Sequence, residues 1–333
     1  MSGASVRVRT CGKTALLCMA AGFAFGQGAP VDAGREPPAA GTATPPAQTA
    51  KPPHATEVML ICPAGEKEVK AAQEGAAAEL GIPVRCTTAF GIDWILIPPG
   101  EFTMGSPDTE KGRRPNEGPQ HRVKINKAFY MSVSETTQGQ FRKVMGYNPS
   151  RFRGLNRPVE RVSWHEAIEF CEKLSTREQK RFRLPTEAEW EYACRAGTTT
   201  RYWWGEDESE AAKHANVLDE SLQRANPGIQ PGFAGDDAHA ETSPIRAYDA
   251  NAFGLYDMIG NVWGWCQSLK KPYPYRRDDG REGTAGEGDR VLRGGSWRSY
   301  QEFCRCASRY GLDPNSKDSH VGFRMVMDIP GHP

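Results

Sequence analysis

Short apolar runs, separated by turn-forming and charged residues, predict a series of strands between residues 58 and 131. One helix interrupts the series, because residues 66 to 80 are rich in Ala, Glu and Lys and Gly81 follows them. We therefore expect residues 58–90 to form a small αβ appendage in front of a main domain that begins near Asp93. The predicted strands are Val58 to Cys62, Trp94 to Ile97, Phe102 to Gly105 and Val123 to Met131.

Two capping boxes mark helix starts further along, because a Glu follows a Ser or Thr by three positions at Ser163 to Glu166 and at Thr186 to Glu189. The first helix is expected to run through Leu174, and the second to about Arg195 with Gly197 as its C-terminal cap. The glutamates that open the second helix are expected to be solvated or to cap it.

Another helix is predicted to open at Thr136 or Thr137 and to end before Gly146. The long stretch after Gly197 is rich in loops. Loops of that length inside a compact domain are usually functional or are braced by ions and disulfides.

Composition narrows the class of protein. The 333 residues carry a formal charge of +1, which gives no strong field for nucleic acid or an anionic membrane. An apolar content of 38%, with 35 Gly, 25 Pro and 8 Trp, indicates a globular protein with much irregular backbone. The seven histidines show no His-x-x-x-His spacing, so a helical zinc site is not indicated.

The N-terminus has the pattern of a secretory signal peptide over residues 1–26. Basic residues precede the apolar run from Thr14 to Phe25, and small residues suit cleavage before Gln27. An uncleaved anchor is the alternative. Residues 27–57 are rich in Pro, Ala, Gly and Thr and predict a disordered linker. We expect an exported protein, periplasmic or extracellular, with no stable membrane span after cleavage.

Export would place the remaining cysteines in an oxidising compartment, which favours disulfides. Seven cysteines follow the signal peptide, and because seven is odd at least one thiol is free or pairs between chains. Cys62 and Cys86 bracket the helix of the appendage, and we expect them to form a disulfide.

The most distinctive loop runs from Arg293 to Trp297 and is followed by Cys304-Arg305-Cys306. Its two glycines allow a positive φ or a close backbone approach. Ser296 and Trp297 bring a hydroxyl and a large ring to the same place.

Together with other segments, this loop resembles the sulfatase-modifying factor family, whose domain is similar to formylglycine-generating enzymes. The resemblance covers about residues 92–327 and implies an α+β fold of the C-type-lectin-like type. The matching segments are Gly100 to Ser106, Ser134 to Gln138, Pro158-Val159, Val162 to Trp164, Arg183 to Arg195, Asn251 to Met258, Gly260 to Trp263, Arg293 to Trp297 and Gly322 to Arg324.

The resemblance also shows a departure from the family pattern at the thiols. The best-known members oxidise a sulfatase cysteine to formylglycine, using two cysteines that hold copper(I) shortly after the loop that matches Arg293 to Trp297. The corresponding stretch here, Arg298 to Phe303, contains no cysteine, so copper is not expected. Cys304 matches a cysteine common in non-oxidising relatives, and the resemblance implies a structural Cys194–Cys306 disulfide.

Family resemblance further implies one calcium site. Its ligands would be the side chains of Asn216 and Asp237 and the carbonyls of Val217 and His239, which are the hard oxygen donors that Ca²⁺ requires. Two solvated loop residues are the alternative at these positions. A second family site needs a Glu where this chain has Gly264, so that site is expected to be weakened or lost.

Two functional hypotheses follow. In the first, the domain is exported, calcium-braced and binds a polypeptide or other extracellular ligand in a pocket around Trp265, Ser296, Trp297 and His320. In the second, it is a divergent formylglycine-generating oxidase that recruits Cys304 and Cys306. No partnership with nucleic acid is expected under either hypothesis.

Overall fold

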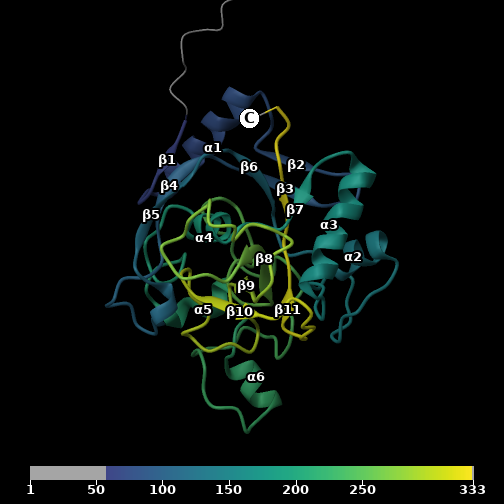
Figure 1. Cartoon of the computed structure of the whole chain (residues 1–333). Coiled ribbons are helices and arrows are strands. Elements are labelled where there is room, and N and C mark those ends of the chain that lie inside the picture. The colour runs from purple at the N-terminus through teal and green to yellow at the C-terminus, as the bar shows by residue number, and fades with distance from the viewer. Residues whose placement is uncertain (1–57, 332–333) are drawn as a thin grey trace, which may run out of the picture. The chain divides into compact units, whose positions relative to one another are not determined.

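Residues 58–331 are described by the computed structural model and form three β-sheets with helices packed around them (Figure 1). The mixture of sheet and helix confirms the α+β class. The predicted signal peptide and linker, residues 1–57, lie outside the described residues. Within residues 58–331, no helix has the length and apolar character needed to cross a bilayer.

The largest sheet has five strands in the order β2-β3-β6-β12-β7, with antiparallel neighbours throughout. A four-stranded sheet has the order β10-β9-β8-β11, and a three-stranded sheet has the order β1-β4-β5. The strands are β1 (Leu60–Ile61), β2 (Arg85–Thr87), β3 (Asp93–Ile97), β4 (Gly100–Met104), β5 (His121–Ile125), β6 (Phe129–Ser132), β7 (Phe182–Arg183), β8 (Trp263–Leu269), β9 (Arg290–Arg293), β10 (Arg309–Leu312), β11 (Val321–Gly322) and β12 (Val326–Met327).

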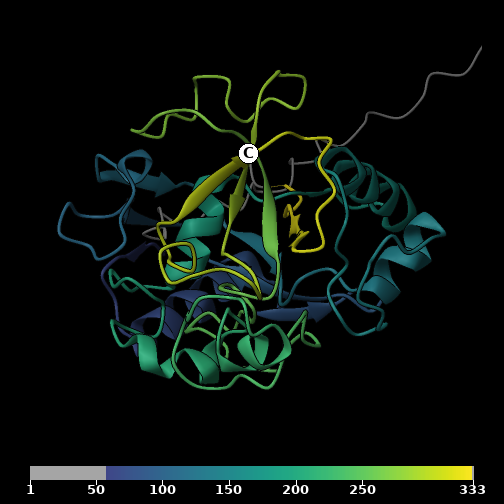
Figure 2. The same ribbon diagram turned by 90° about the horizontal axis from the view of Figure 1, so that it is seen from below.

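Helices flank these sheets, and Figure 2 shows α2 and α3, in teal, to one side of the green to yellow strands β8, β9 and β10. Two short 3₁₀ turns, η1 (Pro115–Glu117) and η2 (Glu208–Glu210), accompany them. The α-helices are α1 (Glu66–Leu80), α2 (Gln138–Met145), α3 (Trp164–Glu178), α4 (Glu187–Arg195), α5 (Ala211–His214) and α6 (Glu220–Ala225).

The five-stranded sheet separates two apolar clusters, as the pleat of β3 shows. Ile95 and Ile97 belong to the cluster that also contains α4, whereas Trp94 and Leu96 belong to the cluster with α2 and α3. Successive side chains of a strand point to opposite faces, so a continuous apolar run can serve two cores at once.

The predicted appendage is instead built into the sheets. β1 pairs with β4 in the three-stranded sheet, while β2 pairs with β3 in the five-stranded sheet. This arrangement corrects the predicted Cys62–Cys86 bridge. Cys62 packs in the cluster of α4, Cys86 lies against the cluster of α2 and α3, and neither is bonded to another cysteine within residues 58–331.

Val123 to Met131 was expected to be one strand and is two. β5 ends at Ile125, β6 begins at Phe129, and the two strands belong to different sheets. The turn between them contains no Gly or Pro, so the sequence carries no strong signal for a break.

The predicted helix ends were mostly confirmed. α1 ends at Gly81, which has a left-handed φ of 63°, and Thr137 caps α2 by accepting from the Gln140 N–H at 3.1 Å. Both capping boxes open helices where expected. The residue that caps α4 in the left-handed conformation is Ala196, with φ of 44°. Gly197, the expected cap, follows it with φ of 96°.

Candidate functional site

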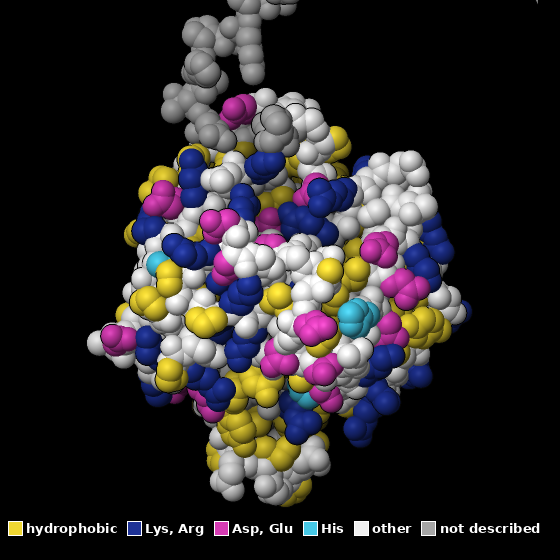
Figure 3. All heavy atoms as spheres, viewed as in Figure 1, with side chains coloured by type: hydrophobic (Ala, Val, Ile, Leu, Met, Phe, Trp, Pro, Cys, Tyr) yellow, Lys and Arg dark blue, Asp and Glu magenta, His cyan; other side chains and the backbone are white. Residues whose placement is uncertain are grey.

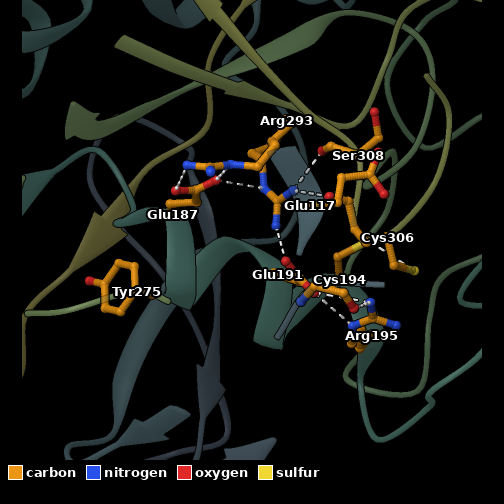
Figure 4. A network of polar contacts seen from close by, with 12 residues as sticks. Glu117, Glu187, Glu191, Cys194, Arg195, Tyr275, Arg293, Cys306 and Ser308 are labelled. Atoms are coloured by element: carbon orange, nitrogen blue, oxygen red, sulfur yellow. Dashed lines mark hydrogen bonds and ion pairs between the residues drawn. The ribbon is translucent and has the colours of Figure 1, made fainter. Parts of the chain in front are cut away.

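The Arg293 side chain is fully buried, and Figure 4 shows it beside Glu187, Glu191 and Ser308. Its guanidinium donates to the Ala307 carbonyl at 2.9 Å, to the Ser308 carbonyl and to the carboxylate of Glu191 on α4. Burial alone would raise the pKa of Glu191, but Arg293 and Arg195 lower it below its ordinary value. The first residue of the loop is therefore part of the scaffold.

The other glutamates of α4 are buried too, so they are not solvated, while the capping role that was the other expectation is confirmed for Glu189. Glu187 accepts two bonds from Arg309, at 2.6 and 2.7 Å. Arg183 donates two hydrogen bonds to the Glu189 carboxylate in a bidentate ion pair, with both N–O distances 2.7 Å. Glu189 also completes the capping box with Thr186. A charge-rich helix start thus marks a buried ion-pair network.

The glycines of the loop permit a close approach of chain segments. Gly294 and Gly295 have φ of 97° and 76°, and a Cβ on Gly295 would lie 2.6 Å from Cys304 Sγ. The loop therefore turns directly over the segment that carries the thiols.

Three of the four predicted pocket residues are buried and do not line the cavity that contains the fourth. Trp265 is fully buried and donates its indole N–H to the Val162 carbonyl at 2.9 Å. Ser296 is buried against the hydroxyl of Ser299 at 2.9 Å. Trp297 packs edge-on against Phe152 in a separate apolar cluster.

His320, the fourth, lies in a cavity of about 430 Å³ on the four-stranded sheet. Trp263, the first residue of β8, lines this cavity, whereas Trp265 does not. The lining residues are Trp263, Leu292, Arg298, Ser299, Tyr300, Phe303, Tyr310, Leu312, Asp318 and His320. We call this cavity the aromatic pocket.

Aromatic rings dominate the walls of the pocket. Trp263 lies 6.3 Å from Phe303 and 6.1 Å from Tyr310, measured between ring centroids. Burial, with a smaller contribution from Arg298, lowers the pKa of His320, although Asp318 opposes the shift. A neutral imidazole at neutral pH can both donate and accept a hydrogen bond.

Cys304 and Cys306 are both fully buried and have different neighbours. Cys306 Sγ lies 3.7 Å from Cys194 Sγ, whereas Cys304 Sγ lies 3.7 Å from the Ser299 carbonyl. The segment is a turn rather than the extended backbone that would point both thiols one way, and burial raises the pKa of Cys304 to about 12. In this structure the two sulfurs therefore lie against different neighbours.

The residues predicted to hold calcium lie in one group of loops. Asp237 accepts from the backbone N–H groups of Val217 and His239, both at 2.8 Å. The Asn216 side-chain oxygen is buried without a hydrogen-bond partner among the described residues. An orphaned amide oxygen next in sequence to a residue that contacts a buried carboxylate fits a hard cation. No group of three His, Cys, Asp or Glu side chains suited to a metal occurs within residues 58–331, so amide and carbonyl oxygens would have to contribute.

Sequence analysis missed Asp219, which lies beside Asp237. Its carboxylate accepts from the Ser221 N–H at 2.9 Å at the start of α6, and it also receives the Asp237 N–H. Burial, followed by the charge of Asp219, raises the pKa of Asp237 to about 7. The spacing Asp-x-Ser, a common helix cap, was the available signal.

Comparison with known proteins gives a consistent result. Residues 85–329 match the family model described as "Sulfatase-modifying factor enzyme 1-like domain". The formylglycine-generating enzyme of Mus musculus is 30% identical over 292 residues, which cover 70% of this chain and 74% of that enzyme. That of Streptomyces coelicolor is 28% identical over 320 residues, covering 78% and 96%.

Two solved structures share the fold. PvdO from Pseudomonas aeruginosa aligns with a TM-score of 0.62 and 28% identity, covering 74% of this chain and 98% of that one. Treponema denticola variable protein 1 aligns with a TM-score of 0.61 and 26% identity, covering 74% and 100%. These neighbours confirm the fold expected from the resemblance.

Proposed function

This chain belongs to the sulfatase-modifying factor family, and from that membership we propose that it binds a polypeptide or other extracellular ligand in the aromatic pocket, without generating formylglycine. The observation that carries the proposal is the lining of the pocket. Aromatic and charged side chains make up most of the lining, and none of the described residues that form it is a cysteine.

The pocket offers the contacts that ordinary ligand sites use. Rings supply large contact area at low cost in conformational entropy, since each has only two rotatable side-chain bonds. Arg298 and Asp318 are exposed and form no ion pair within residues 58–331, so their charges are available to a ligand. His320 adds a neutral donor and acceptor between them.

We further propose that calcium braces the loops around α6. The side chains of Asn216 and Asp237 and the carbonyls of Val217 and His239 would hold the ion, and Asp219 would add charge beside it. Bound calcium would relieve the repulsion between the two buried carboxylates. The ion has no chemical step in this proposal.

Export to the periplasm or beyond is part of the same proposal. It rests on the signal-peptide pattern of residues 1–26, and secretion assays of the full chain with and without that segment test it.

Peptide selection from a random displayed library tests the pocket. Selected peptides are expected to bind the wild-type protein and to lose about tenfold or more in affinity on Tyr310→Ala, since central aromatic residues dominate binding energy. Tyr147→Ala is the matched control, because Tyr147 is 42% exposed and Tyr310 is 43% exposed. If Tyr310→Ala and Tyr147→Ala weaken peptide binding equally, or if neither weakens it, the peptides do not bind in the aromatic pocket.

A further inference from the structure

Strand β5 is the outer strand of the three-stranded sheet, and within residues 58–331 it pairs only with β4. The Cys62 N–H donates to the Glu101 carbonyl at 2.9 Å, so the backbone groups of Glu101 point toward β1. Those of Phe102 then point toward β5, where they meet Val123. By the same alternation, the N–H and C=O groups of Arg122 and Lys124 point away from the sheet.

Those outward groups border a groove. Beside β5, a cavity of about 190 Å³ is lined across from the strand by Thr186, Ala188, Tyr275 and Arg277. It continues into a larger cavity of about 870 Å³, since Ile125 and Arg277 line both. We call the two together the β5 groove.

The β5 groove carries excess positive charge. Its acidic residues, Glu189 and Asp328, are already paired with Arg183 at 2.7 and 3.0 Å. The space-filling view shows Lys and Arg side chains on the upper part of this face, with Asp and Glu side chains among them (Figure 3). Four exposed groove cations form no ion pair within residues 58–331, namely Lys124, Lys127, Lys180 and Arg277.

We propose that the β5 groove binds an extended acidic polypeptide segment, which adds a strand to the free edge of β5. Main-chain hydrogen bonds to Arg122 and Lys124 would provide affinity, as in other cases of strand addition. Alternate side chains of the added strand would face Lys124 and Arg277, and acidic residues at those positions complement the charge. This surface shares no residue with the aromatic pocket.

A basic edge strand can also serve two simpler roles. Lysine on such a strand can act only to prevent unwanted pairing between molecules. A second copy of this chain could also pair there, but it would set Arg122 and Lys124 against the same cations, and like charges opposite each other destabilise a strand pair. Charge complementarity therefore favours an acidic peptide.

The test uses the full chain and a fluorescein-labelled octapeptide of alternating Glu and Val, followed by fluorescence anisotropy. We expect saturable binding that falls about tenfold or more when alternate peptide nitrogens are methylated, because methylation removes donors and leaves the charge. We expect Lys124→Glu to weaken binding about tenfold and Lys67→Glu, an exposed change of equal charge on α1, to leave it unchanged. Tyr310→Ala should also leave it unchanged.

Several outcomes would overturn the proposal. If the peptide does not bind, the lysines of β5 act only to prevent unwanted pairing between molecules. Equal binding of the methylated peptide, or stronger competition by a heparin fragment than by unlabelled peptide, would show attraction of charge alone. A concentration-dependent dimer that Lys124→Glu changes would identify a second copy as the occupant.

Discussion

Two neighbouring residues of β9 show how differently two regions of this molecule are built. Leu292 lines the aromatic pocket, whereas the Arg293 side chain enters the buried network of α4. In the network, Glu187, Glu189 and Glu191 each meet an arginine. At the pocket, Arg298 and Asp318 form no ion pair with any described residue. Charges satisfied within the fold hold a scaffold together, while unsatisfied charges at a cavity are available to a ligand.

The largest expected effect is on the network side of this comparison. Glu191→Ala should lower the free energy of unfolding by roughly 3–5 kcal/mol, because it leaves the buried Arg293 guanidinium without its carboxylate. Urea unfolding measures the loss. Glu169→Ala, which breaks an exposed pair with Lys173, should cost less than about 1 kcal/mol. Similar losses for the two variants would contradict the distinction.

Disulfide formation would strengthen the same scaffold. Peptide mapping under nonreducing conditions should find Cys194 joined to Cys306, whose sulfurs lie 3.7 Å apart, and Cys304 as a free thiol. Cys306→Ser should then cost about 2–4 kcal/mol relative to the oxidised protein. Detection of a Cys304–Cys306 disulfide would instead contradict the structural role of Cys306 and would make both thiols candidates for the functional site.

Calcium should matter next, and its effect should depend on pH. The folded pKa of Asp237, about 7, lies above the ordinary value of the unfolded chain. Without calcium, the stability contributed by protonated Asp237 is present below pH ~4 and is lost as pH rises through 7. Calcium binds the carboxylate, so its stabilisation should be greater at pH 8 than at pH 5.5, reaching about 2.7 kcal/mol at a hundredfold excess over Kd.

Melting temperatures with calcium and with a chelator, at both pH values, check this expectation. Asp237→Asn should remove the difference between them. A calcium effect that is absent, or that is equal at both pH values, would reject the site.

The smallest effect on stability is expected at the pocket itself. Tyr310 is 43% exposed, so Tyr310→Ala should change the free energy of unfolding by less than about 0.5 kcal/mol. Urea unfolding beside the peptide-binding assay separates the two effects. A loss above about 2 kcal/mol would show that the pocket wall also supports the scaffold.

The sequence predicted the elements whose signals are local. Gly81 ended α1, and the Ser163 and Thr186 boxes opened α3 and α4, because caps depend on a few adjacent residues. It did not predict that the Val123 to Met131 run divides between two sheets, since the division depends on partners distant in the chain.

The site was predicted less well for the same reason. Trp265 and Trp263 look alike in sequence, but Trp265 is fully buried with its indole N–H bonded to the Val162 carbonyl, whereas Trp263 lines the pocket. The sequence around Glu191 is typical of an exposed helix start. Only the contact with Arg293, which is distant in sequence, shows that this glutamate belongs to a buried ion pair. Long-range contacts of this kind leave no periodic pattern.

The central claim is that this family member binds a ligand without performing the family's oxidation. The most direct measurement incubates the protein with copper, oxygen and a peptide containing Cys-x-Pro-x-Arg, and follows the peptide by mass spectrometry. The mouse formylglycine-generating enzyme serves as the positive control. We predict no aldehyde from this protein. Aldehyde formation that disappears on Cys304→Ala or Cys306→Ala would contradict the claim and establish a divergent oxidase.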